Sequence, residues 1–289
     1  MSSVSNFAIA LPFGGNFAYL KKTVESVIGQ TFKNWHMTIL DDASQVKELK
    51  GYIDSLNDSR ISLIQFNLKK GIVNIYEESK KYLNSEWNMI LNADDILGSE
   101  FLRDISNIVE NLDNVDIIQP NVKIIDKNGR RIQTSFDIVK ALIRGRKSSR
   151  LLTSEAAIFK LSLGNWLYFP SLIWNRRLLI DLKFDGSLPV AFDFKLLVDL
   201  LLQDKTIYIA KEPVFFYRRH KSSNSMSDLN ANLRSHEERE IFDFLSKSLK
   251  ERRKYSLFIV AKLRLSNRLF VMYSILVNRK FLKSSFGIK

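Results

Sequence analysis

Two apolar segments of this chain each run into a pair of adjacent carboxylates, and this feature most constrains what the chain can fold into. Residues 37–40 lead into Asp41-Asp42, and residues 89–91 lead shortly afterwards into Asp94-Asp95. Short apolar runs bounded by polar or turn residues are typical of buried β-strands. Two strands that end in the same chemistry indicate a shared site at one edge of a sheet.

The rest of the chain alternates apolar strand patterns with helical ones. We expect strands near residues 7–11, 37–40, 61–65, 89–91, 116–119 and 206–210, and helices near residues 16–30, 71–83, 99–111 and 191–202. Strands separated by helices form βαβ units, so the pattern predicts an α/β fold with a mixed, mostly parallel sheet flanked by helices. Parallel strands end at one edge of a sheet, where such folds bind ligands, and both acidic pairs would line that crevice.

The second acidic pair is a candidate metal site. Mg²⁺ takes oxygen ligands and usually binds through one or two carboxylates together with substrate phosphates. The alternative is that Asp95 simply caps the following helix. The chain has no cysteine and only three histidines, which argues against thiolate and zinc sites.

Positive charge is concentrated at the C-terminal end. Of the net charge of +13, residues 250–289 carry +10, from eleven basic residues and one acidic residue. Apolar residues recur there at helical spacing, at Phe258, Ala261, Leu265, Leu269, Met272 and Leu276. We therefore predict a domain of residues 1–225 followed by a basic amphipathic helical extension, residues 226–289, on an anionic membrane surface. Packing on the main domain and a homodimer interface are the alternatives.

Further expectations concern the ends of the chain and its partners. The N-terminal residues lack the pattern of a signal peptide, and no apolar run reaches the length of a membrane span, so we expect a cytoplasmic protein that is peripheral on the inner face of the cell membrane. Residues 1–249 carry a net charge of only +3, and we expect no nucleic-acid partner.

A capping-box pattern at Ser235 and Glu238 predicts where the extension's first helix begins.

A shorter basic run lies in residues 134–165, a segment whose structure the sequence does not predict clearly. It consists of Arg144, Arg146, Lys147 and Arg150, next to apolar residues. We expect a solvated loop. Contact with an acceptor or a phosphate is the alternative.

The order of the motifs resembles glycosyltransferase family 2, a large family of inverting enzymes with the GT-A fold. The match covers residues 7 to about 225, and it depends on the ordered set rather than on any single motif. The matching residues are Pro12, Leu20, Ser26, Gln30-Thr31-Phe32, Asp41-Asp42-Ala43-Ser44, Asn67, Gly71, Asn92-Ala93-Asp94-Asp95, Pro170-Ser171, Asp193 and Tyr217-Arg218-Arg219-His220.

The resemblance implies transfer of a sugar from a nucleotide-diphosphate sugar to an acceptor hydroxyl, in the synthesis of a cell-envelope or surface polysaccharide. Asp95, with His220 as a further ligand, would bind Mg²⁺ or Mn²⁺, which offsets the charge on the leaving diphosphate. The acceptor would be a glycan or a lipid-linked glycan. The residues that would contact the donor are Pro12, Phe13, Gly14, Asp41, Asp42, Gly71, Asn92 and Asp94.

Inversion requires a base that takes the proton of the attacking hydroxyl, and the resemblance assigns this role to Asp193. By itself, a carboxylate in the first turn of a helix has a sufficient structural reason in the helix dipole, and the ordered set of motifs is what favours the base.

The chain departs from the family pattern at Gly14-Gly15, which replace Tyr-Asn, and at Asn92, which replaces the first Asp of the metal motif. These departures support one alternative, a catalytically silent GT-A-fold binding or scaffold protein. A sugar nucleotidyltransferase is a second alternative, but its glycine-rich loop with Arg after the first strand is missing here.

Overall fold

The computed structural model describes residues 6–112, 114–145, 148–179, 182–219 and 228–269. Its strands are β1 (Phe7–Phe13), β2 (Trp35–Asp41), β3 (Ile61–Gln65), β4 (Trp87–Ile90), β5 (Ile96–Leu97), β6 (Ile117–Ile125), β7 (Arg150–Leu152), β8 (Ile173–Asn175) and β9 (Ile207–Arg218). Its α-helices are α1 (Phe17–Ile28), α2 (Leu49–Ser55), α3 (Ile72–Ser79), α4 (Phe101–Glu110), α5 (Ser135–Arg144), α6 (Ser154–Leu163), α7 (Phe192–Leu202), α8 (Asp228–Glu251) and α9 (Tyr255–Leu263). Short 3₁₀ helices are η1 (Lys80–Tyr82), η2 (Phe169–Ser171) and η3 (Arg176–Leu178).

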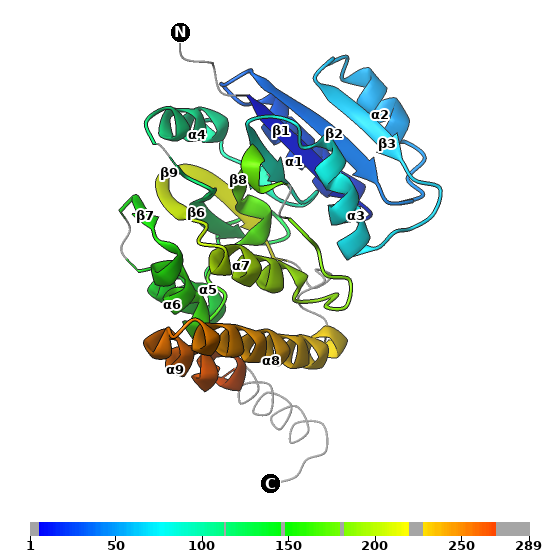
Figure 1. Ribbon diagram of the computed structural model, residues 1–289. Helices are drawn as coiled ribbons and strands as arrows, with labels where there is room; N and C mark the ends of the chain where they lie inside the picture. Colours follow the sequence, from blue (N-terminus) through cyan, green and yellow to red (C-terminus); the bar gives the residue numbers. More distant parts are fainter. Residues whose placement is uncertain (1–5, 113, 146–147, 180–181, 220–227, 270–289) are drawn as a thin grey trace.

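These strands form one continuous sheet with the order β3-β2-β1-β4-β8-β6-β9-β5, and β7 also pairs with β9 (Figure 1). The long ladders, β1 with β2, β2 with β3 and β6 with β9, are parallel. The antiparallel ladders, such as β4 with β8, are short. The predicted α/β fold with a mostly parallel sheet, flanking helices and C-terminal helices is confirmed.

Strand β1 is central because both of its faces are apolar. Phe7, Ile9 and Leu11 point into one buried cluster, and Ala8 and Ala10 point into another on the opposite face. Buried runs without polar alternation are what a sheet covered on both faces requires.

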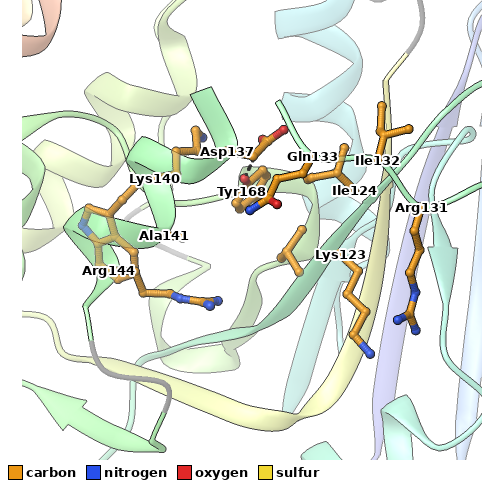
Figure 2. A pocket seen from close by; sticks show the side chains of 12 residues that line it. Lys123, Ile124, Arg131, Ile132, Gln133, Asp137, Lys140, Ala141, Arg144 and Tyr168 are labelled. Carbon is orange, nitrogen blue, oxygen red and sulfur yellow. Dashed lines mark hydrogen bonds between the residues drawn. The ribbon is translucent and has the colours of Figure 1, made fainter. Parts of the chain in front are cut away.

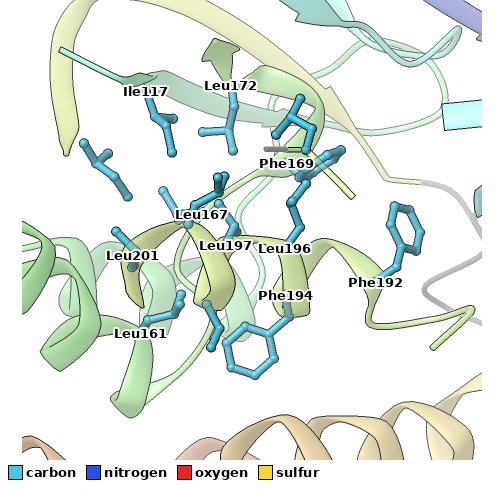
Figure 3. Packing of buried hydrophobic residues seen from close by; sticks show 14 of the residues in the cluster. Ile117, Leu161, Leu167, Phe169, Leu172, Phe192, Phe194, Leu196, Leu197 and Leu201 are labelled. Atoms are coloured by element: carbon cyan, nitrogen blue, oxygen red, sulfur yellow. The ribbon is translucent and has the colours of Figure 1, made fainter. Parts of the chain in front are cut away.

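The helices divide between the two faces of the sheet. Helices α1, α2 and α4 cover the face with the large side chains of β1, through residues such as Leu20, Leu49 and Phe101. Helices α3, α6, α7 and α8 contribute to the other cluster. Figure 3 shows α7 at its centre, with Leu196 and Leu197 directed towards the segment that carries η2.

The described part of the extension packs on this second cluster. Ile241, Phe242 and Leu245 of α8 and Ala261 of α9 are buried in the same cluster as α7 (Figure 1). By contrast, Leu269 of the predicted stripe is exposed, and residues 270–289, with Met272 and Leu276, lie outside the described residues. The boundary near residue 225 stays a prediction.

The predicted start of the extension's first helix at Ser235 is wrong, because Ser235 lies inside α8. The carboxylate of Glu238 does not reach back to Ser235; instead it accepts a hydrogen bond of 2.8 Å from Nε of Arg234. Over the stretches of chain that the structure describes, every helix is too short or too polar to cross a membrane.

Candidate active site

The two acidic pairs meet at the same edge of the sheet, as predicted. Phe13 at the end of β1 lies opposite Asp41 at the end of β2, and Ala10 lies opposite Ile90 at the end of β4. The amide of Asp42 donates to the carbonyl of Phe13 at 2.7 Å. Strand β1 therefore separates the two pairs at one carboxyl edge.

The first pair is buried and fully engaged by backbone and amide groups. The Asp42 carboxylate accepts hydrogen bonds from the amides of Lys70 at 2.6 Å and Gly71 at 3.1 Å. Gly71 has φ of +80°, a conformation that favours glycine, and it directly precedes α3. The Asp42 carboxylate thus holds the end of the loop that leads into α3 in place through the amides of Lys70 and Gly71.

Asp41 is engaged in a similar way. Its Oδ1 accepts from the amide of Ser44 at 2.9 Å, and its Oδ2 accepts from Nε2 of Gln65 at 3.1 Å. These bonds hold the turn after β2. The nucleotide contacts predicted for both aspartates stay predictions.

The second pair is different, because Asp95 is fully buried and keeps one oxygen without a partner. Its Oδ1 accepts from the amide of Arg218 at 2.8 Å, whereas its Oδ2 has no hydrogen-bond partner among the residues that the structure describes. Burial, with the nearby Asp94 carboxylate, raises the pKa of Asp95 well above its usual range. A buried carboxylate oxygen without a partner is costly, and a bound cation would offset that cost.

Mg²⁺ and Mn²⁺ fit this environment. Such an ion needs only one or two protein carboxylates when substrate phosphates and water supply its other ligands. In the described part of the chain, no three His, Cys, Asp or Glu side chains form a group arranged to hold a metal by themselves. Asp95 is the residue that fits, and His220, the predicted further ligand, lies outside the described residues.

Arg218 of β9 is the buried cation of the site. Its Nε donates to the carbonyl of Asp94 at 2.7 Å, its Nη1 donates to the carbonyl of Asp126 at 3.0 Å, and its guanidinium lies 4.7 Å from the ring of Tyr19. Its Nη2 is buried and has no hydrogen-bond partner within the described ranges. The predicted motif included this arginine, but nothing in the pattern showed that it holds both aspartates.

Tyr76 of α3 links the sheet edge to α7. Its hydroxyl donates to Oδ1 of Asn92, and its ring packs 5.4 Å from that of Phe192. Burial raises the pKa of Tyr76 well above its usual range, and the charges of Asp95, Asp94 and Asp193 raise it further. One buried hydroxyl therefore lies within electrostatic reach of the predicted metal ligand and the predicted base.

Asp193 lies in the first turn of α7, where the sequence placed it. Its Oδ1 accepts from the amide of Phe194 at 2.7 Å. Burial raises the pKa of Asp193, and the positive charges of Arg234 and Lys140 oppose that rise. Asp193 therefore has two cations nearby that favour its ionised form.

Helix α8 builds part of this site. Oε2 of Glu237 accepts from the amides of Val190 at 3.0 Å and Ala191 at 2.6 Å, just before α7 begins. Those amides belong to a helix N-terminus, which has no intrahelical acceptors to offer them. Glu237 and Arg234 were not predicted from the sequence, because no local motif connects α8 with α7.

The remaining predicted residues lie at the end of β1 and beside α3. The ring of Phe13 is buried in the hydrophobic core, so only its backbone is available to a ligand. Pro12 is half-buried and Gly14 is exposed. A side chain at Gly14 would come 3.7 Å from Cβ of Asp42.

Comparison with known proteins identifies a family. The model of glycosyl transferase family 2 matches residues 9–176, which is more than half of the chain. Escherichia coli WfgD, a UDP-Glc:alpha-D-GlcNAc-diphosphoundecaprenol beta-1,3-glucosyltransferase, is 27% identical over 110 residues, which cover 38% of this chain and 42% of WfgD. The minor teichoic acid biosynthesis protein GgaB of Bacillus subtilis is 22% identical over 238 residues, which cover 78% of this chain and 24% of GgaB. The matches thus span less than half the length of either relative.

Solved structures show the same fold. Residues 1–349 of TarS from S. aureus superpose with a TM-score of 0.65 at 17% identity, covering 90% of this chain and 71% of that chain. The same TarS fragment in complex with UDP-GlcNAc superposes with a TM-score of 0.61 at 17% identity, covering 85% and 73% of the two chains. With the family match, these similarities confirm the predicted resemblance: the chain has the GT-A fold and belongs to glycosyltransferase family 2.

Proposed function

We propose that this protein is an inverting, metal-assisted glycosyltransferase that moves a sugar from a nucleotide-diphosphate sugar to an acceptor hydroxyl. The observation that carries the proposal is the buried, unpartnered Oδ2 of Asp95 at the sheet edge. The charges of both Asp95 and Asp193 raise the pKa of the Tyr76 hydroxyl, so the two carboxylates lie within electrostatic reach of one group. Family membership supports glycosyl transfer, and the TarS complex with UDP-GlcNAc supports a nucleotide-sugar donor.

The donor side of the reaction is assigned to Asp95 and Arg218. Asp95 would hold Mg²⁺ or Mn²⁺, which supplies Lewis-acid stabilisation of the leaving diphosphate when it is bound. Arg218 places a fixed positive charge against the backbone carbonyl of Asp94 and within electrostatic reach of the Asp95 carboxylate, and its unpartnered Nη2 is a donor suited to a phosphate oxygen. The hydroxyl of Tyr76 donates to Oδ1 of Asn92, and we assign Asn92 to the donor rather than to the ion.

The acceptor side is assigned to Asp193. As the acceptor oxygen bonds to the anomeric carbon, its proton passes to the Asp193 carboxylate, and the diphosphate leaves from the opposite face. A base works best when its pKa lies close to the working pH, and burial shifts the pKa of Asp193 in that direction. The positive charges of Arg234 and Lys140 oppose that rise and favour the ionised form that acts as the base.

We further propose that the acceptor belongs to cell-envelope or surface polysaccharide synthesis, as the names of WfgD and GgaB suggest. The extension would then bring the enzyme to an anionic membrane. Three exposed residues of α9 at four-residue spacing, Tyr255, Ile259 and Leu263, support this, together with the basic charge of residues 250–289. Cosedimentation with anionic and neutral vesicles tests this, and equal recovery with both would reject it.

The test of the main proposal is hydrolysis and transfer with a panel of nucleotide sugars, with Mn²⁺ and with EDTA. We expect turnover of at least one donor that requires the metal. If the folded protein neither turns over a donor nor binds a nucleotide diphosphate in a metal-dependent way, it is a silent GT-A-fold binding protein, the alternative that the Asn92 replacement favours.

A further inference from the structure

A cavity lies between α5 and β6. It has a volume of about 640 Å³ and is lined by Val122, Lys123, Ile124, Arg131, Ile132, Gln133, Asp137, Lys140, Ala141, Arg144, Trp166 and Tyr168. Figure 2 shows basic side chains on both sides of it, with Lys140 and Arg144 on one side and Lys123 and Arg131 on the other. We refer to it as the α5 pocket.

The pocket has an excess of positive charge. Its one carboxylate, Asp137, is already neutralised, because it accepts from Nη2 of Arg219 at 2.6 Å and from the hydroxyl of Tyr168 at 2.8 Å. The charged ends of Lys123 and Arg144 make no hydrogen bond or ion pair with any residue for which the structure gives a position. Uncompensated cations in a concave site favour an anionic ligand.

One basic residue of the pocket is partly desolvated. Nζ of Lys140 donates to the carbonyl of Leu167 at 2.7 Å and lies 4.2 Å from the ring centre of Tyr168. Burial, with the charges of Arg234 and Arg219, lowers the pKa of Lys140 to about 7. A bound anion would reverse this effect by stabilising the ammonium form.

The pocket lies within electrostatic reach of the proposed base. Lys140 and Asp193 affect each other's pKa, and each favours the charged form of the other. The ring of Tyr168 lies 5.4 Å from that of Tyr217, the residue before Arg218 in β9. The pocket is therefore connected to the candidate active site through Tyr168, and a ligand in it would lie within electrostatic reach of Asp193.

The outer face of α5 is apolar. One face of α5 lines the pocket, through Asp137, Lys140, Ala141 and Arg144. The adjoining face carries Ile138, Val139 and Leu142, whose exposed fractions are 45%, 51% and 74%. Three exposed aliphatic side chains on one helix are unusual for a surface that meets only water. Here they lie next to a basic cavity.

We propose that the α5 pocket binds the phosphate group of a lipid-linked acceptor, while Ile138, Val139 and Leu142 contact its hydrocarbon chain. This inference builds on the proposed function, since it assigns the acceptor's anchor to a site within electrostatic reach of Asp193. The cations account for the phosphate, and the apolar face selects an amphiphile over a free phosphate or a water-soluble phosphate polymer. The sugar of such an acceptor would extend towards Asp193.

Calorimetric titration with octyl phosphate and with inorganic phosphate tests the proposal. The titrations are done on the full chain with Mg²⁺ and saturating UDP, so that the donor site does not compete for the phosphate. The variant K123Q/R144Q removes two cations of the pocket, and R239Q/K247Q removes one arginine and one lysine from the exposed surface of α8 as a matched control. The matched control for L142S is L68S. Leu68 is also exposed, and it lies in the loop before α3, distant in the sequence from α5.

We expect K123Q/R144Q to weaken octyl phosphate binding by about tenfold or more, because each charge-assisted hydrogen bond contributes more than a neutral one. The control pair should bind like the wild type. L142S should weaken octyl phosphate but not inorganic phosphate, and L68S should change neither.

Equal binding to the wild type and K123Q/R144Q would overturn the phosphate site. Equal affinity for octyl phosphate and inorganic phosphate, with no effect of L142S, would overturn the proposal that the acceptor is lipid-linked. The ligand of the pocket would then be a soluble phosphate. Failure of UDP to bind would count against the proposed function alone, because the comparison of the variants still reports on the pocket.

Discussion

The two acidic pairs of this protein have the same sequence pattern and the same position on the sheet edge, but their surroundings differ. Asp41 and Asp42 direct their oxygens to backbone amides and to Gln65. Asp95 is fully buried beside Arg218 and keeps Oδ2 without a partner among the described residues. The first pair therefore holds the loops, whereas Asp95 keeps an oxygen to which we assign the proposed cation. Position on the sheet brings carboxylates together, but the supply of local donors decides what each can bind.

The largest expected effect is at the second pair. Asp95→Asn should lower metal-dependent donor turnover by about 10²–10³-fold, the range for loss of a main electrostatic contact to a developing charge. Because burial already raises the pKa of Asp95 and so disfavours its charged form, and because Asn keeps an oxygen that can accept from the amide of Arg218, unfolding by urea should show little loss of stability. A stability loss as large as that of Asp42→Ala would contradict the distinction between the pairs.

The next effect separates the base from the donor site. Asp193→Asn should lower transfer by about 10²–10⁴-fold, the usual contribution of a general base, and leave donor binding intact. Single-turnover transfer and equilibrium binding of the donor measure the two quantities. Asp199→Asn, on the same helix in an ion pair with Lys195, is the matched control and should change neither. Normal transfer by the Asp193 variant would show that another residue takes the proton.

At the first pair, stability should change more than chemistry. Asp42→Ala leaves the amides of Lys70 and Gly71 without their acceptor, which should cost about 1–3 kcal/mol in the free energy of unfolding. Asp54→Ala removes an exposed ion pair with Lys50 and should cost at most about 1 kcal/mol. Urea denaturation compares the two. If Asp42→Ala is as stable as the control and loses only nucleotide binding, then the first pair is also a ligand site.

The smallest effect is a shift in the pH dependence. Arg234 lowers the pKa of Asp193, so Arg234→Gln should raise that pKa further. Because the base acts when deprotonated, the acidic limb of the kcat profile should move to higher pH. Arg239→Gln, an exposed arginine on the same helix, should leave the profile unchanged. A shift to lower pH, or an equal shift in both variants, would contradict the assignment.

The parts of the site that the sequence predicted are those built by local patterns. Residues 61–65 form β3 with the predicted bounds, and both acidic pairs lie at strand ends, because apolar runs and the breaks after them are local signals. Asp193 lies in the first turn of α7 for the same reason. The basic run is a different case: the sequence predicted a solvated loop, but Arg144 ends α5 and lines a pocket.

What the sequence did not predict depends on contacts between distant segments. Glu237 caps α7 from a helix that begins far along the chain, and Tyr76 joins α3 to the end of β4. The capping-box prediction at Ser235 failed because Glu238 pairs with Arg234 inside a helix that had already begun. In each case the partner of a polar group is chosen by tertiary packing, which no short motif contains.

The central claim is that Asp95 is the residue through which this protein holds a metal and its nucleotide. Calorimetric titration of UDP into the wild type and Asp95→Asn, each with Mn²⁺ and with EDTA, tests it most directly. The account predicts that Mn²⁺ strengthens UDP binding to the wild type and has no effect on the variant. The same gain from Mn²⁺ in both proteins would contradict it.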